Sequence, residues 1–494
     1  MNTLAAGEQL SDNKLGGNYP FWLIRDGKVD WSLFADEAVN SIPIEKRELD
    51  PVAVLSSLCF GYICLDRTLI KGLNRAPWFG SVDSEGRKTY FQAPPHGEQI
   101  IDHDRLSKML IKALREEIGG LCQGYERVWC LLSGGMDSRV IAAIIHDLQR
   151  SGDVTSEIRA VTWGRENCRD IAYSRQIADA FGWEWFRIPL TAEDYWMNFE
   201  RSAKFLAAEV IPNLHRIDWF SEIQSNDLVI AGSYGDGVGR AEYSSRHVSQ
   251  LKGLNPVERY GLLSQKALNE LLPILKRDIL AIRDHHGERT ELGWFEIERQ
   301  AHYMRRGLSD ILGMINRWGR LEQAFVAQSV FSIMWACSPS IRTNELYTEL
   351  LRQLDPSMLE IPWSKTGTLY GSVSGEPDTL DKDFHQYGLW LRRDLADRME
   401  HTLFEMNLDK LGLFNMNQLH WLFKSWKSEP KDSLTTLSVH LSWIAVLALF
   451  IDMYNVYLNE DYSDTMLTGS MSVIKKMQAR VLHYGYNSLR SIRG

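Results

Sequence analysis

The apolar positions of the chain change their spacing near residue 100. Residues 103–118 carry apolar side chains every three or four positions and are followed by two glycines, which predicts a helix and its end. Beyond it, four short apolar runs predict strands, at residues 127–132, 158–163, 184–190 and 227–232. Helices are expected at residues 138–149 and 170–181. Apolar strands that alternate with helices predict an α/β fold with a parallel sheet flanked by helices.

The sequences on either side of this region have a different pattern. Residues 1–100 contain many turn formers, and the runs 78–82 and 88–92 flank a turn signal, so we expect a β hairpin there. From about residue 255 onward the pattern is mainly helical. A chain of 494 residues is too long for one ordinary core. We therefore expect a small β-rich domain over residues 1–100 and a larger domain over residues 101–494.

Charge and composition argue against several classes of protein. The net charge of -9 disfavours binding to nucleic acid through overall electrostatics, although a local basic patch would not show in that sum. The six cysteines are scattered, which suits a reducing compartment and argues against a zinc site. No signal-peptide pattern is found, and the best apolar run, 443–451, is too short to span a membrane and predicts a buried core helix. We expect a soluble, cytoplasmic protein.

The segment "VWCLLSGGMDSRVI", residues 128–141, leads from a predicted strand into a predicted helix. Glycines at 134 and 135 let an anion approach backbone N–H groups, and hydroxyls at 133 and 138 add donors. Asp137 would repel a phosphate unless a cation such as Mg²⁺ lay between them. The same residue types also form ordinary helix-capping turns, but the position between strand and helix favours a site for a metal-bound polyphosphate. The Gly-Lys-Ser/Thr ending of a Walker A loop is absent.

This loop resembles the pyrophosphate-binding loop of the PP-loop ATP pyrophosphatases, and its surroundings resemble the synthetase domain of the asparagine synthetase family. That family includes β-lactam synthetases, carbapenam synthetases and lasso-peptide cyclases. Four further segments are similar to the family: "FGYICLDRTLIKGLNRAPWFGSV", "AVTWGRENCRDIAYSRQIADAFGWEWFRIPL", "DLVIAGSYGDGVGRAEY" and "LDPSMLEIPWSKTG". The resemblance covers about residues 51–450. It implies a PP-loop (HUP-like) sheet of five parallel strands, extended by a helical C-terminal half.

The resemblance also implies roles for single residues. Residues matching the family's ATP site are Leu132, Ser133, Gly134, Gly135, Asp137, Ser138, Val161, Thr162, Ala231 and Gly232. Asp137 and Asp236 match the two acids that hold Mg²⁺ on the triphosphate. Lys365 matches the lysine that stabilises charge on the phosphates and on the tetrahedral intermediate. Taken alone, Asp236 could be a turn residue and Lys365 a solvated surface residue.

The implied reaction is amide formation with release of AMP. A small-molecule or peptide carboxylate would be adenylated, pyrophosphate would leave, and an amine or ammonia would then form the amide. Glutamine-using relatives begin with a nucleophilic cysteine after the initiator methionine, whereas Asn2 stands here, and Cys59 lies in an apolar run. We therefore expect residues 1–100 to be a shortened, non-catalytic amidohydrolase-like (Ntn) domain. The amine then comes from solution, from the substrate itself or from a separate protein.

The general base is not assigned by the resemblance. Asparagine synthetases usually have a glutamate where Ser233 stands, and β-lactam synthetases have a tyrosine there, so Tyr234 would serve only if the loop is shifted. Glu322 falls where the family has an acidic or basic residue near the substrate. The candidate catalytic residues are thus Lys365, Tyr234 and Glu322.

Two other classes of function remain open. A PP-loop enzyme that modifies tRNA or another nucleic acid would require a cysteine pair or a basic groove, and the sequence shows neither. In a catalytically silent interaction protein, the acidic residues of the former active site would be expected to be lost first, yet Asp137 and Asp236 are present. The sequence predicts no membrane partner, and a homodimer stays open.

Overall fold

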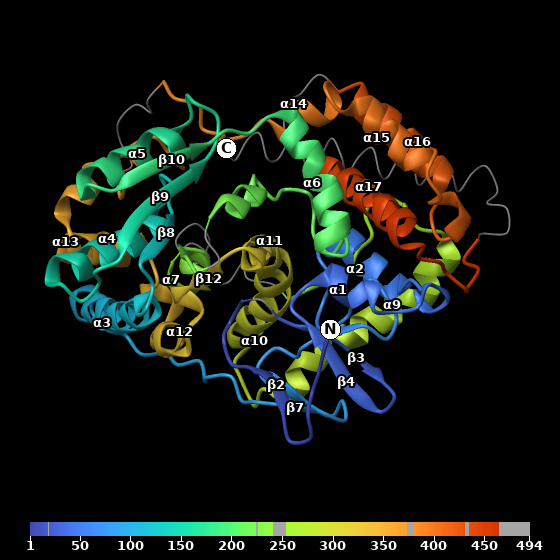
Figure 1. Cartoon of the computed structure of the whole chain (residues 1–494), viewed down its shortest axis with the longest axis horizontal. Helices are drawn as coiled ribbons and strands as arrows, with labels where there is room; N and C mark the ends of the chain where they lie inside the picture. Colours follow the sequence, from blue (N-terminus) through green and yellow to red (C-terminus); the bar gives the residue numbers. More distant parts are fainter. Residues whose placement is uncertain (18, 224–225, 241–252, 373–378, 430–433, 464–494) are drawn as a thin grey trace.

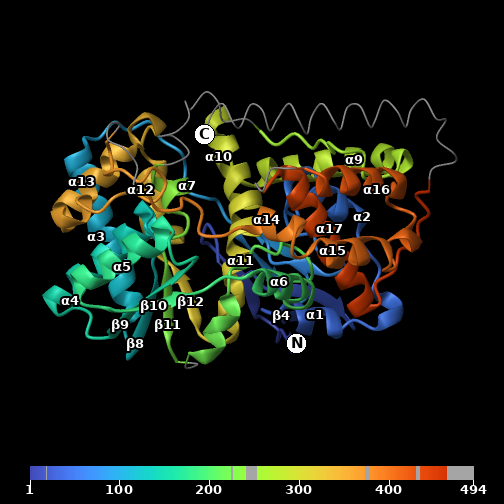
Figure 2. The same cartoon turned by 90° about the horizontal axis from the view of Figure 1, so that it is seen from above.

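The computed structural model describes the chain except residues 18, 224–225, 241–252, 373–378, 430–433 and 464–494. Figures 1 and 2 show two groups of elements, one around the parallel sheet and one around the N-terminal strands and C-terminal helices. Between the two groups lie α10 (Glu291–Glu298) and α11 (Asp310–Gly313). These two helices are joined by an 11-residue π-helix, η5 (Arg299–Ser309).

The parallel sheet has five strands in the order β10-β9-β8-β11-β12. Their bounds are β8 Arg127–Leu131, β9 Glu157–Trp163, β10 Glu184–Ile188, β11 Leu228–Ala231 and β12 Arg320–Gln323. All four pairings are parallel. The chain goes from β8 outward to β9 and β10, then returns to the other side of β8 at β11. This reversal places a switch point at the carboxyl ends of β8 and β11, where open α/β sheets bind ligands.

The central strands are apolar because both of their faces are buried. Alternate residues of a strand point to opposite faces, so Cys130 and Ile230 pack on one side while Trp129 and Val229 pack on the other. The first face shares its core with a set of helices: α3 (His103–Cys122), α4 (Met136–Ser151), α5 (Arg169–Phe181), α12 (Gln328–Trp335) and α13 (Asn344–Leu354). The strands and helices predicted between residues 103 and 232 are confirmed, but the predicted end of the first helix is wrong, because α3 continues through Gly119 and Gly120 to Cys122.

The N-terminal residues form two small antiparallel sheets. One has the order β1-β4-β3-β5, and its strands are β1 Asn2–Thr3, β3 Phe21–Arg25, β4 Lys28–Ser32 and β5 Asn74–Arg75. The other has the order β2-β6-β7, and its strands are β2 Gln9–Asp12, β6 Gly80–Asp83 and β7 Lys88–Tyr90. The antiparallel pair β6 and β7 is the predicted hairpin.

A second core joins the N-terminal and C-terminal parts of the chain. It contains residues of α1 (Ala35–Asn40) and α2 (Pro51–Phe60) from the predicted small domain. Later helices complete it: α6 (Ala192–Phe205), α9 (Gln265–Leu280), α14 (Tyr387–Arg392), α15 (Ala396–Phe404), α16 (Met416–Lys427) and α17 (Thr436–Tyr454). This core crosses the boundary expected near residue 100, and the division into domains stays a prediction.

Helix α17 is longer than the apolar run that predicted it. It spans 19 residues, from Thr436 to Tyr454, so it is long and apolar enough to cross a membrane by length and composition. The expectation that this segment is too short is therefore wrong. The structure buries 72% of its most apolar stretch inside the protein, as expected for a core helix.

Candidate functional site

A cavity of about 410 Å³ lies at the carboxyl ends of β8, β9 and β11. Eight of its lining residues belong to the predicted nucleotide set: Leu132, Ser133, Gly135, Asp137, Ser138, Thr162, Ala231 and Gly232. The rest of the lining is Leu131, Trp163, Asp170, His215, Ser233, Leu312, Ser364 and Phe384. The cavity thus sits at the switch point that the strand order creates.

The loop between β8 and α4 is held by its own serines. Ser133 N donates to Ser138 Oγ at 3.1 Å, and Gly135 N donates to Ser133 Oγ at 3.1 Å. Helix α4 begins at Met136, and the residue before it, Gly135, provides no side-chain cap. The positive end of a 16-residue helix therefore borders the cavity together with the hydroxyls of Ser133 and Ser138. This is the arrangement that binds anions.

Two residues of the predicted nucleotide set do not line the cavity. Val161 is fully buried in the core of the sheet. Gly134 N donates to Asp170 Oδ1 at 2.9 Å, so this N–H holds the loop to the start of α5. A Cβ on Gly134 would lie 2.8 Å from Ser364 Cβ, so the glycine permits close packing of a distant segment.

Gly232 at the end of β11 packs directly against the start of α4. A Cβ at this position would lie 2.6 Å from Ser138 N and 2.7 Å from Ser138 Cα, both backbone atoms. Backbone atoms of a buried helix cannot move aside as a flexible side chain can. The absence of a side chain at 232 therefore sets the separation of β11 from the anion-binding loop.

We expect Gly232→Ala to weaken nucleotide binding at least about tenfold and to destabilise the fold by about 1–3 kcal/mol, because the methyl group overpacks this contact. Gly120→Ala is the matched control, since Gly120 lies inside α3 and its Cβ would meet nothing within 4 Å. Alanine should leave the protein equally stable or stabilise it slightly there. Calorimetry with Mg-ATP and thermal unfolding of both variants test this, and equal effects of the two would contradict it.

Asp137 is the acidic residue of the loop, and its side chain is 23% exposed. Arg240 Nη2 donates to its two oxygens at 3.2 and 3.3 Å. Burial raises the pKa of Asp137 to about 6 against the lowering effect of Arg240, and repulsion by Asp236 adds to the rise. The two predicted metal ligands, from the loops after β8 and β11, thus feel each other's charge. Asp236 is solvent-exposed.

These two carboxylates fit a magnesium ion that is shared with a substrate. Within the described residues, no group of three or more His, Cys, Asp and Glu side chains could hold a metal. Mg²⁺ is commonly bound by only one or two carboxylates, with phosphate oxygens and water completing its coordination. Asp137 and Asp236 match that pattern, and a cation beside them would relieve the repulsion between them.

Comparison with known proteins agrees with this geometry. The asparagine synthase family matches residues 110–214, which include β8, α4, β9 and the loop between the first two. The match covers about a fifth of the 494-residue chain. The predicted resemblance to this family is thereby confirmed for this segment.

Two matching proteins cover different shares of the chain. The glutamine-hydrolysing asparagine synthetase of Gallus gallus is 30% identical over 70 residues, 14% of this chain and 12% of that protein. The structure of NMN synthetase from Francisella tularensis covers 44% of this chain and 93% of its own, with 16% identity. Its TM-score of 0.19 is too low for the likeness to carry an argument.

The three candidate catalytic residues taken from the asparagine synthetase family do not line the cavity. Tyr234 is 1% exposed, and its hydroxyl donates to Met304 O at 2.8 Å and lies 2.5 Å from Ser309 Oγ. Glu322 lies on edge strand β12 and forms an ion pair with Lys14 at 3.1 Å. Lys365 is exposed, with Nζ 5.2 Å from the Trp363 ring centre, although its neighbour Ser364 does line the cavity. Their catalytic roles stay predictions that this geometry does not support.

Arg139 has a structural role that the sequence did not reveal. Its side chain is fully buried and donates to four backbone carbonyls: Met358 O, Ile361 O and Pro362 O at 2.7–2.8 Å, and Gly134 O at 3.2 Å. It thereby fastens the segment that carries Ser364 and Lys365 onto the loop after β8. Arg139 does not point to solvent, and its donors are used by carbonyls rather than phosphates.

Aromatic residues form part of the cavity wall. The Trp163 ring centre lies 5.3 Å from that of His215, and the Phe384 ring lies 5.2 Å from His215. Trp163 follows the predicted Thr162 at the end of β9, a position that sequence reasoning could have included. His215 and Phe384 come from irregular segments with no motif in the sequence, so only the fold brings them to the cavity.

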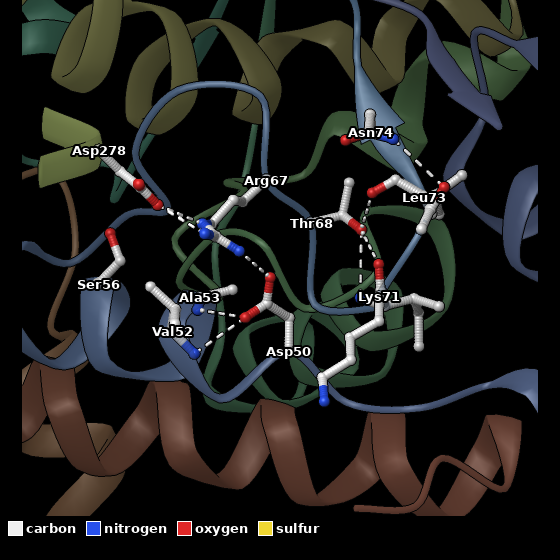
Figure 3. Close-up of polar contacts among 12 residues, drawn as sticks. Asp50, Val52, Ala53, Ser56, Arg67, Thr68, Lys71, Leu73, Asn74 and Asp278 are labelled. Carbon is white, nitrogen blue, oxygen red and sulfur yellow. Dashed lines mark hydrogen bonds and ion pairs between the residues drawn. The ribbon is translucent and has the colours of Figure 1, made fainter. Parts of the chain in front are cut away.

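A second cavity of about 420 Å³ lies near α2 and α9 (Figure 3). Arg67 lies between Asp50 and Asp278, each 2.6 Å away. Lys71 is paired with Glu48 at 2.8 Å and with Glu460 at 3.0 Å. Arg67 and Lys71 are thus neutralised within the protein, whereas the cavity after β8 is bordered by the start of a 16-residue helix.

Proposed function

We propose that the protein is an ATP-dependent, AMP-forming amide synthetase. The observation that carries this proposal is the cavity at the switch point, which is lined by Asp137 and the start of α4. Asp236 is not among the lining residues, but its charge acts on Asp137. ATP would fill it with its phosphates at the start of α4, beside the hydroxyls of Ser133 and Ser138. Asp137 and Asp236 would hold Mg²⁺, which would neutralise part of the charge of the triphosphate.

The reaction would proceed in two steps. An oxygen of the substrate carboxylate attacks the α-phosphorus, the bond to the β-phosphate oxygen breaks, and pyrophosphate leaves as the acyl-adenylate forms. The amine nitrogen then attacks the acyl carbon, loses a proton, and AMP leaves with the remaining electron pair. Holding both reactants in one dry site supplies most of the rate enhancement expected of such an enzyme.

The cysteines count against glutamine hydrolysis by this chain. Burial raises the thiol pKa of all six, so none is activated as a thiolate. Cys59 lies on α2, packed against the second core, and has no lowered pKa that would favour glutamine hydrolysis. The same observation counts against the alternative of a PP-loop enzyme that transfers sulfur to nucleic acid.

Nucleotide product analysis tests the proposal. The protein is incubated with Mg-ATP, each of the twenty amino acids and cell-extract fractions as carboxylates, and ammonium chloride as amine. We expect AMP and pyrophosphate in equal amounts, dependent on one carboxylate. ADP with phosphate as the products would contradict adenylation. Failure to bind ATP would favour the catalytically silent interpretation.

A further inference from the structure

Three titratable side chains line the cavity, and two of them are already engaged. Asp137 is paired with Arg240. Asp170 accepts from Gly134 N and from the Ser364 hydroxyl, so it fixes the loop after β8. The third is His215, which lies on the irregular segment between α6 and the 3-10 helix η2 (Ile217–Glu222). No residue with the role of proton acceptor has yet been assigned to this cavity.

The position of His215 is fixed by its neighbours. Its backbone has φ +53°, a left-handed conformation that is costly for a residue other than glycine. Asn198, which is 1% exposed, holds this conformation through a hydrogen bond of 2.6 Å from Nδ2 to the His215 carbonyl. Backbone strain of this kind at a cavity wall persists because the surrounding structure imposes it.

One ring nitrogen of His215 has a hydrogen-bond partner. Nδ1 lies 3.4 Å from the hydroxyl of Tyr387 at the start of α14, while Trp163 and Phe384 border the ring. The Tyr387 hydroxyl can donate to Nδ1 or accept from it; in the tautomer in which Nδ1 donates, Nε2 carries the lone pair. Within the described residues, Nε2 has no protein hydrogen-bond partner that would block it.

The surroundings keep this imidazole neutral in the empty cavity. Burial lowers the pKa of His215 to about 4, and His385 acts in the same direction. The other titratable groups near it are Tyr387, beside the ring, and Asp170 and Asp137, which line the same cavity. A triphosphate in the cavity adds negative charge, which raises the pKa of a nearby histidine toward the range useful for proton transfer.

We propose that His215 is the general base that removes the proton from the attacking amine. This inference rests on the proposed function. As the amine nitrogen bonds to the acyl carbon, Nε2 accepts one proton from that nitrogen. The tetrahedral intermediate then collapses to the amide, AMP leaves, and the imidazolium returns its proton to solvent. His215 takes the role for which Tyr234 and Glu322 were candidates.

Histidine NMR tests this without knowledge of the substrate. The protein is labelled with ¹⁵N-histidine, and the His215 signals are assigned by their loss in His215→Gln. We expect the tautomer protonated at Nδ1. We also expect the His215 pKa to rise by about one unit or more when Mg²⁺ and α,β-methylene-ATP saturate the protein. A tautomer protonated at Nε2, or an unchanged pKa with nucleotide bound, would overturn the assignment, whereas failure of the nucleotide to bind would reject the proposed function itself.

Kinetics separate the role of His215 from a structural one. With the carboxylate identified by nucleotide analysis, His215→Gln should retain ATP–pyrophosphate exchange but form amide about 10²–10⁴-fold more slowly. His401→Gln is the matched control, because His401 is exposed, pairs with Glu405 and does not line the cavity. This control should change neither step. Equal loss of exchange and amide formation in His215→Gln would show a structural role instead.

Discussion

Replacing Asp137 with asparagine should reduce ATP–pyrophosphate exchange by at least about 10²-fold. The amide side chain would keep the size of the carboxylate and an oxygen that accepts from Arg240, but it would lose the charge that attracts Mg²⁺. The expected loss therefore concerns the metal-bound triphosphate rather than the fold. Exchange assays and calorimetric titration with Mg-ATP measure it.

The variant Asp137→Ala tests the metal-binding role less directly, because it also affects the stability of the fold. Arg240 is only 3% exposed, and Asp137→Ala would leave this buried cation without its carboxylate. Removing one partner of a buried pair can cost several kcal/mol. Unfolding of both variants therefore serves as the control. Normal exchange by a folded Asp137→Asn protein would contradict the role of Asp137 in binding the metal.

Replacing Arg139 with methionine should destabilise the protein by about 3 kcal/mol or more. Four backbone carbonyls would lose their donor in a fully buried position, and each buried unsatisfied acceptor costs about 1–3 kcal/mol when it cannot reach water. The segment holding Ser364 would also lose its attachment to the loop after β8. We therefore expect weaker Mg-ATP binding together with the loss of stability.

Arg165→Met is the matched control for this variant. Arg165 pairs with Asp381 at 2.7 Å, but the two side chains are 30% and 50% exposed. Surface pairs of this kind contribute about 1 kcal/mol or less. Urea unfolding of the two variants distinguishes them. A loss for Arg139→Met no larger than that for Arg165→Met would contradict the fastening role of Arg139.

The sequence predicted the sheet and its loop because their physical causes are local. The strands of the sheet core are apolar runs, and the loop after β8 has the glycines and serines that its geometry requires. Strand β12 was missed because it is a four-residue edge strand, "RLEQ", with only one buried residue. The fifth strand was expected from the family resemblance, but no local pattern located it.

The rest of the site depends on contacts between distant segments. Arg240 reaches Asp137 across 103 positions of the chain, and His215 meets Phe384 across a still longer separation. Tyr234 lies in a loop beside the cavity, yet its side chain does not line the cavity. Its hydroxyl instead donates to Met304 O in η5. Sequence spacing identifies residues near a site but does not fix the direction of their side chains.

A crystal structure with Mg²⁺ and α,β-methylene-ATP tests the central claim most directly. We predict the triphosphate at the start of α4, within hydrogen-bonding distance of Ser133, Gly135 and Ser138. Mg²⁺ should lie between the phosphates and Asp137. A nucleotide bound elsewhere, such as in the cavity near Arg67, or a triphosphate directed away from α4, would contradict the account.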